Sequence, residues 1–147
     1  LTMQGIKTLD LRVKQHSRNA QAVAEFLEQH PQVSKVYYPG LASFAQKELA
    51  ATQHRGGFHG GMLAFEVVGG YEHALHVMNS VVLCTLAESL GATETIITHP
   101  ASMTHVMMAA EQRLAIGVSD GLIRFSVGLE DTEDIIRDLE QALIWTK

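Results

Sequence analysis

The chain has 147 residues, 46% hydrophobic and 18% charged, which suffices for one domain with a core but not for two ordinary domains. Its net charge of −5 and its scattered lysines and arginines offer no basic surface to a phosphate backbone, so we expect no nucleic-acid partner. No apolar run approaches the ~20 residues of a membrane-spanning helix and no signal peptide is recognisable, so we expect a soluble, cytoplasmic protein without a membrane partner.

The first half of the chain predicts helices and strands in alternation. In chain order these are a helix over 8–30, a strand over 33–38, a helix over 43–53, a strand over 62–68 and a helix over 71–81. Pro31 ends the first helix, and Ser43 is the expected N-cap of the second. The third helix should turn Ala74, Leu75 and Met78 inward. Because a helical pattern already runs through residue 3, we expect the chain to be a fragment of a longer protein.

The second half continues the same alternation. Its elements are extended segments over 81–89 and 93–100, a short helix over 109–117, a strand over 121–127 and a final helix over 130–147. Asp131 or Thr132 should cap the final helix. Its buried stripe should consist of Ile135, Leu139, Ala142 and Leu143. The pattern therefore predicts an α/β fold in which four or five strands are covered by four or five helices.

Arg124 stands in the middle of a predicted strand whose successive side chains face opposite ways. Ile123 and Phe125 form an apolar face, and Arg124 lies on the other. A guanidinium taken out of water costs several kcal/mol unless an anion meets it. An acid of the chain, such as Glu88 or Glu130, could supply that anion, and so could the carboxylate of a ligand. The residue pattern leaves both alternatives open.

The histidines and glycines give weaker signals. His73 and His76 lie three residues apart on a predicted helix, but no third ligand occurs at matching spacing. His99 and His105 flank the segment PASMT and also lack a third ligand, so we expect no metal site. The glycines of residues 56–61 lead into a strand and not into a helix N-terminus, so they indicate a turn and not a phosphate-binding loop.

Nucleophilic catalysis finds little support in the sequence. Ser89, His99 and Asp120 could be combined into a catalytic triad, but no serine lies in a Gly-x-Ser-x-Gly motif. The lone Cys84 cannot form an internal disulfide, and we expect it to pack in the core.

Five segments of the chain resemble the C-terminal region of the pyridoxal-phosphate enzymes of cysteine and methionine metabolism, the cystathionine γ-lyase and γ-synthase family. They are QGIKTLDLR at 4–12, VYYPGL at 36–41, LAESLGATET at 86–95, HPASMTH at 99–105 and DGLIRFSVGLED at 120–131. Their order and approximate spacing match as well, and the similarity covers essentially all 147 residues.

This resemblance implies the small C-terminal domain of a fold-type I pyridoxal-phosphate enzyme over residues 1–147. Such a domain has a four- to five-stranded, largely antiparallel sheet with helices packed on it, preceded by a long connecting helix over about 1–30. The resemblance also implies a sulfur amino-acid substrate, an N-terminal cofactor-binding domain that this chain lacks, and a homo-tetramer built mostly through that domain.

The resemblance assigns roles to three residues. The arginine matching Arg124 binds the α-carboxylate of the substrate, and the serine matching Ser89 lies beside the substrate and the cofactor lysine. At the position of Glu88, cystathionine-handling members tend to carry Glu and methionine γ-lyases a small apolar residue. Glu88 therefore favours cystathionine as the substrate, with methionine γ-lyase as the alternative within the family.

The cofactor lysine of the family lies in a Ser-x-Thr-Lys-type motif that has no match in this chain. The lysines present are Lys7, Lys14, Lys35, Lys47 and Lys147. We therefore expect a substrate-binding half-site of a carbon–sulfur lyase or transferase of trans-sulfuration, catalysing β/γ-elimination or γ-replacement. By itself the chain should bind no cofactor and be inactive. The alternative from another class is a free-standing, non-catalytic domain for amino-acid binding or assembly.

Overall fold

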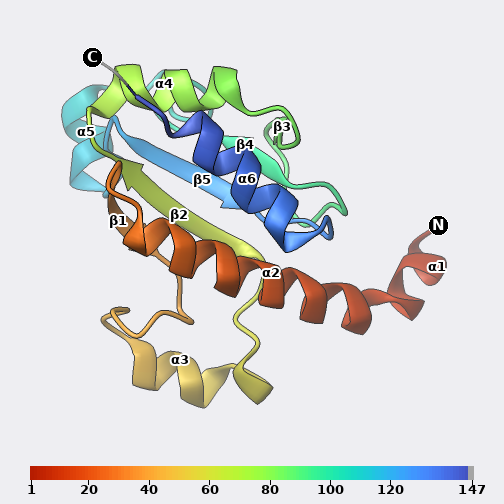
Figure 1. Ribbon diagram of the computed structural model, residues 1–147. Coiled ribbons are helices and arrows are strands. Elements are labelled where there is room, and N and C mark those ends of the chain that lie inside the picture. Colours follow the sequence, from red (N-terminus) through yellow and green to blue (C-terminus); the bar gives the residue numbers. More distant parts are fainter. Residues whose placement is uncertain (146–147) are drawn as a thin grey trace.

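Five strands form a single sheet in the computed structural model, which describes residues 1–145 (Figure 1). The strands are β1 (Val33–Tyr37), β2 (Met62–Val67), β3 (Thr85–Leu86), β4 (Ile96–Thr98) and β5 (Leu122–Ser126). Their order across the sheet is β1-β2-β5-β4-β3, and β5 is central. The pairs β1–β2, β2–β5 and β5–β4 are antiparallel, while β4–β3 is parallel. The expected α/β class with a largely antiparallel sheet is confirmed.

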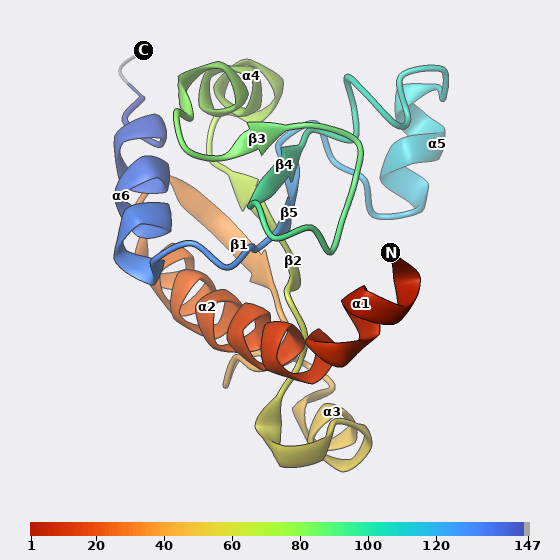
Figure 2. The same ribbon diagram turned by 90° about the vertical axis from the view of Figure 1, so that its right-hand side faces the viewer.

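Helices cover one face of this sheet more completely than the other. The helices are α1 (Thr2–Lys7), α2 (Leu9–Gln29), α3 (Lys47–Gln53), α4 (Gly70–Ser80), α5 (Ala110–Ala115) and α6 (Thr132–Ala142). Figure 2 shows α2 and α6 on one side of the sheet and α5 on the other. We call the side packed against α2, α4 and α6 the covered face, and the opposite side the open face. Within residues 1–145, none of the helices has the length and apolar character to cross a membrane.

The core lies between the covered face and these three helices. Phe65 on β2 and Phe125 on β5 are fully buried, and their ring centroids lie 6.3 Å apart in an edge-to-face arrangement. The predicted stripe of α6 is confirmed, because Ile135, Leu139, Ala142 and Leu143 are all fully buried. The carboxylate of Asp131 accepts the N–H of Glu133 at 2.9 Å and caps α6 as predicted.

Helix boundaries differ from the sequence prediction at three places. The expected helix over about 1–30 is interrupted at Thr8, whose φ of −111° is not helical, so α1 and α2 are separate. Ser43 is not an N-cap, since α3 begins only at Lys47 and the Ser43 hydroxyl instead donates to Glu28. The final helix ends at Ala142 and not near 147, and residues 146–147 lie outside the described part of the chain. In α4, Ala74 and Met78 are buried as predicted, whereas Leu75 is only half-buried.

Asp138 explains why the expected extended segment over 81–89 shortens to the two residues of β3. Its carboxylate accepts the N–H groups of Val82, Leu83 and Cys84 at 2.7, 2.9 and 2.9 Å, so these groups are turned toward α6 and not toward a strand. Burial raises the pKa of Asp138, but these backbone N–H groups outweigh it and hold the pKa below its usual value. Cys84 is buried beside it, which confirms its predicted place in the core.

Candidate functional site

Arg124 lies at the middle of β5 with its side chain on the open face of the sheet. Its cross-strand neighbours are Ala64 on β2 and Thr98 on β4. Ile123 and Phe125, on either side of it, are fully buried in the covered face, as the strand alternation predicts. The side chain is half-buried, and none of the salt bridges or hydrogen bonds within residues 1–145 involves its guanidinium. The guanidinium is therefore available to an anion.

The two acids considered as internal partners of Arg124 are placed otherwise. The carboxylate of Glu130 accepts the N–H of Thr95 at 2.7 Å and its hydroxyl at 2.8 Å. Glu88 is exposed and forms no salt bridge within residues 1–145. The geometry thus gives no support to a structural ion pair for Arg124.

The segment that carries Ser89 is fixed against the open face at both ends. The hydroxyl of Thr98 donates to the carbonyl of Ala87 at 2.6 Å, and the N–H of Gly91 donates to the Ser126 hydroxyl at 3.0 Å. Thr98 on β4 is the cross-strand neighbour of Arg124. Ser126 lies on β5 itself, two residues after Arg124. The two hydrogen bonds therefore bring the exposed Glu88 and Ser89 to the part of the sheet that carries Arg124.

Thr98 and Ser126 have a positioning role that the sequence analysis did not find. The sequence does indicate that Ser126 lies on the same face as Arg124, because side chains alternate along β5. Nothing in the sequence shows which backbone group its hydroxyl contacts, because the two groups are 35 residues apart in the chain.

A second polar group on the open face surrounds Glu66 on β2. Its carboxylate accepts the Ser119 hydroxyl at 2.9 Å and also binds the hydroxyl of Tyr37. Burial raises the pKa of Tyr37, and the hydrogen bond to Glu66 adds to this increase. The ammonium of Lys35 lies 4.6 Å from the centroid of the Tyr37 ring. The open face thus combines charged and hydroxyl groups where the covered face is apolar.

His99 and Arg113 brace the start of β5 and do not belong to a catalytic triad. His99 is fully buried, its Nε2–H donates to the Asp120 carbonyl at 2.9 Å, and its Nδ1 accepts the hydroxyl of Ser102 at 2.8 Å. Burial lowers the pKa of His99, which favours this neutral ring. The carboxylate of Asp120 pairs with Arg113. A Ser89–His99–Asp120 arrangement is therefore not formed.

The other histidine pair also has structural neighbours. The ring of His73 is fully buried and stacks on Trp145 with 5.0 Å between centroids, and its Nδ1–H donates to the carbonyl of Val68. Within residues 1–145, no three His, Cys, Asp or Glu side chains are grouped closely enough to hold a metal ion.

Known sequences that are similar to this chain include enzymes of cysteine and methionine metabolism. The family model for "Cys/Met metabolism PLP-dependent enzyme" matches residues 1–144. L-methionine gamma-lyase of Porphyromonas gingivalis is 57% identical over 143 residues, which cover 97% of this chain and 35% of that protein. Cystathionine gamma-lyase of Bacillus subtilis is 48% identical over 143 residues, covering 97% of this chain and 37% of that protein. The chain thus spans about a third of the length of these relatives.

Solved structures of similar proteins share the fold. A cystathionine gamma synthase from Xanthomonas oryzae pv. oryzae, in complex with aminoacrylate and cysteine, has a TM-score of 0.89 and 46% identity over 97% of this chain and 36% of its own. A crystal structure assigned to an O-acetylhomoserine (thiol)-lyase of Campylobacter jejuni has a TM-score of 0.91 and 41% identity over 95% of this chain and 33% of its own. The chain therefore belongs to the family of pyridoxal-phosphate-dependent enzymes of cysteine and methionine metabolism.

Proposed function

We propose that this chain is the C-terminal, substrate-carboxylate-binding domain of a pyridoxal-phosphate-dependent enzyme that acts on cystathionine or a related sulfur amino acid. The observation that carries the proposal is Arg124, a half-buried cation without an ion-pair partner among residues 1–145. The two parallel N–H donors of its guanidinium match the two oxygens of an α-carboxylate. Ser89 forms the wall beside that carboxylate.

Glu88 assigns the substrate within this proposal. Its exposed carboxylate lies on the same segment as Ser89, which hydrogen bonds fix against the open face of the sheet, the face that carries Arg124. A carboxylate here attracts the distal ammonium group of cystathionine, whereas the methyl thioether of methionine offers it no partner. The second candidate is methionine γ-lyase, because a 57% identical relative carries that name. Either assignment corresponds to β/γ-elimination or γ-replacement at a carbon–sulfur bond.

Enzymes that use pyridoxal phosphate hold it covalently through a lysine. The lysines of the described chain do not suit this attachment. Lys7, Lys35 and Lys47 are exposed, and the half-buried Lys14 pairs with Asp10 at 2.8 Å. Lys147 lies outside the described residues. In this proposal the cofactor belongs to an N-terminal partner domain. The homo-tetramer and the cytoplasmic location form part of the same proposal, while the greater length of the relatives supports only the separate N-terminal domain.

The experiment uses the enzyme in which this chain is joined to its N-terminal domain. Arg124→Ala should lower kcat/KM for cystathionine, while Arg137→Ala, which removes an exposed arginine of α6, should leave it unchanged. If Arg124→Ala turns over cystathionine and methionine as fast as the unmodified enzyme, Arg124 is not the carboxylate anchor. If cofactor-loaded protein turns over neither substrate, the non-catalytic binding or assembly domain becomes the better description.

A further inference from the structure

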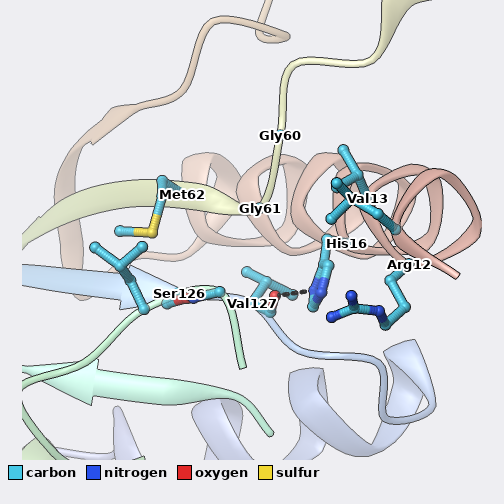
Figure 3. A pocket seen from close by; sticks show the side chains of 11 residues that line it. Arg12, Val13, His16, Gly60, Gly61, Met62, Ser126 and Val127 are labelled. Atoms are coloured by element: carbon cyan, nitrogen blue, oxygen red, sulfur yellow. Dashed lines mark hydrogen bonds between the residues drawn. The ribbon is translucent and has the colours of Figure 1, made fainter. Parts of the chain in front are cut away.

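A cavity of ≈ 250 Å³ lies where the first turns of α2 meet the beginning of β2 and the end of β5 (Figure 3). One wall is formed by four residues of α2, namely Leu9, Arg12, Val13 and His16. Because these residues are three or four positions apart, they lie on a single face of the helix. The facing wall includes the side chains of Met62, Leu90 and Val127. The cavity is thus mainly apolar.

One side of this cavity is held in place by tight contacts. His16 is 5% exposed, and its Nδ1–H donates to the carbonyl of Val127 at 2.7 Å, which joins α2 to the end of β5 (Figure 3). Gly61 permits this approach, since a Cβ there would lie 3.0 Å from the Cβ of His16 and 3.1 Å from the Val127 carbonyl oxygen. The side of the cavity formed by His16, Gly61 and Val127 is therefore preformed.

Arg12 is the only permanently charged residue among the lining residues of the described chain. Its Nη2–H donates to the Gly5 carbonyl at 2.8 Å and its Nε–H to the Thr8 hydroxyl at 3.3 Å. These bonds orient the guanidinium and use no anion, so its positive charge is not compensated by an acid within residues 1–145. A ligand with one negative charge complements this wall.

The same lining limits what else could bind. No acidic side chain lines the cavity within the described residues, so the ammonium group of an amino acid would find no counter-charge beside Arg12. A volume of ≈ 250 Å³ holds about eight non-hydrogen atoms at the ~30 Å³ that one water occupies in the liquid. The size and charge together describe a short aliphatic carboxylate.

We propose that this cavity is a binding site for a small apolar monocarboxylate, with its hydrocarbon chain against Val13, Met62 and Leu90 and its carboxylate on Arg12. The site adjoins the one assigned to Arg124, because Gly91 and Ser126 also line the cavity, but its charged group is Arg12 and it does not depend on that assignment. Hexanoate, with eight non-hydrogen atoms, is the probe that fits. Its dissociation constant should be on the order of 1 mM, as expected for a ligand of this size.

The test titrates the 147-residue chain with hexanoate, 1-hexanol and acetate while amide chemical shifts are followed by NMR. Hexanoate should bind at least about tenfold more tightly than 1-hexanol or acetate, with shifts at residues 60–62, 90–91 and 126–127. Arg12→Gln should reduce hexanoate affinity to the level of 1-hexanol and leave the alcohol unaffected. Val13→Phe, which fills the cavity, should remove the shifts caused by both ligands.

Arg124→Gln removes the uncompensated arginine of the open face and shows whether hexanoate binds there instead. The matched control is Arg137→Gln, which removes an exposed arginine of α6 and should leave hexanoate binding unchanged. If hexanoate affinity falls with Arg124→Gln and persists with Arg12→Gln, the carboxylate binds at Arg124 and the proposal is wrong. Equal affinity for hexanoate and 1-hexanol, or no shifts at the cavity residues with about 20 mM hexanoate, would also overturn it. The amide spectrum of each variant shows directly whether that variant is folded. If Arg12→Gln does not fold, Val13→Phe tests whether hexanoate binds in this cavity.

Discussion

The five residues of β5 place their side chains in two different environments, one on each face of the sheet. On the covered face, Ile123 and Phe125 are fully buried beneath helices. On the open face, the half-buried Arg124 lies between strands that carry hydroxyl and carboxylate groups. The covered face gains its stability from apolar burial, whereas the open face keeps a charge that nothing within residues 1–145 neutralises. Substitutions on the two faces should therefore separate stability from function.

The largest effect should come from the covered face. Phe125→Ala removes a fully buried ring that packs on Phe65 and should lower the free energy of unfolding by about 3–5 kcal/mol. Chemical denaturation of the chain measures this change. Leu122→Ala, a half-buried position on the open face of the same strand, is the control and should cost about 1 kcal/mol or less. Equal losses for the two variants would contradict the distinction between the faces.

The next largest effect should appear in function alone. In the full-length enzyme, Arg124→Ala should lower kcat/KM by ~10²-fold or more, because two charge-assisted hydrogen bonds and the orientation of the substrate are lost. Arg124→Lys should recover only part of the activity, since an ammonium cannot reproduce the planar fork. Thermal unfolding should shift by only a few degrees. A large loss of thermal stability with normal turnover by the remaining folded enzyme would show that Arg124 serves the core.

Asp138 sharpens the comparison because it is a buried charge on the covered side. Asp138→Asn weakens three hydrogen bonds to backbone N–H groups and should cost about 2 kcal/mol at neutral pH. The pKa of Asp138 is lower in the folded than in the unfolded chain, so its stabilisation is complete above its usual value of 3.8 and is lost as the pH falls below that value. Denaturation midpoints measured between pH 7 and pH 2 should show a smaller acid-induced loss for Asp138→Asn. Parallel pH curves would disprove this role.

The smallest effect concerns substrate choice on the open face. In the full-length enzyme, Glu88→Val should raise the ratio of kcat/KM for methionine to that for cystathionine about tenfold, which is ~1.4 kcal/mol of differential transition-state binding. Glu88 is exposed, so the stability of the fold should not change. The matched control is Glu94→Val, at another exposed acid six residues further on. A ratio that stays constant would remove the support for cystathionine as the preferred substrate.

The sequence by itself determined the α/β class, the apolar stripe of α6 and the two faces of β5. These features follow from side-chain periodicity of 3.6 or 2 residues, which acts between near neighbours in the chain. Resemblance to a family, carried by short motifs, indicated Arg124, Ser89 and Glu88. Their roles at the site remain predictions for the experiments above.

Only the tertiary structure decided which distant groups meet. The Thr98 and Ser126 hydroxyls fix the segment that carries Ser89, and the Asp138 carboxylate ends the extended segment before β3 from 54 to 56 residues away. Ser43 binds Glu28 on α2 and does not cap a helix, although its sequence context favours capping. A hydroxyl or carboxylate can satisfy its hydrogen bonds with many partners of similar energy, and the packing of the chain selects among them. Local sequence carries no information on that selection. The cavity beside Arg12 likewise exists only because the fold packs α2 against β2 and the end of β5.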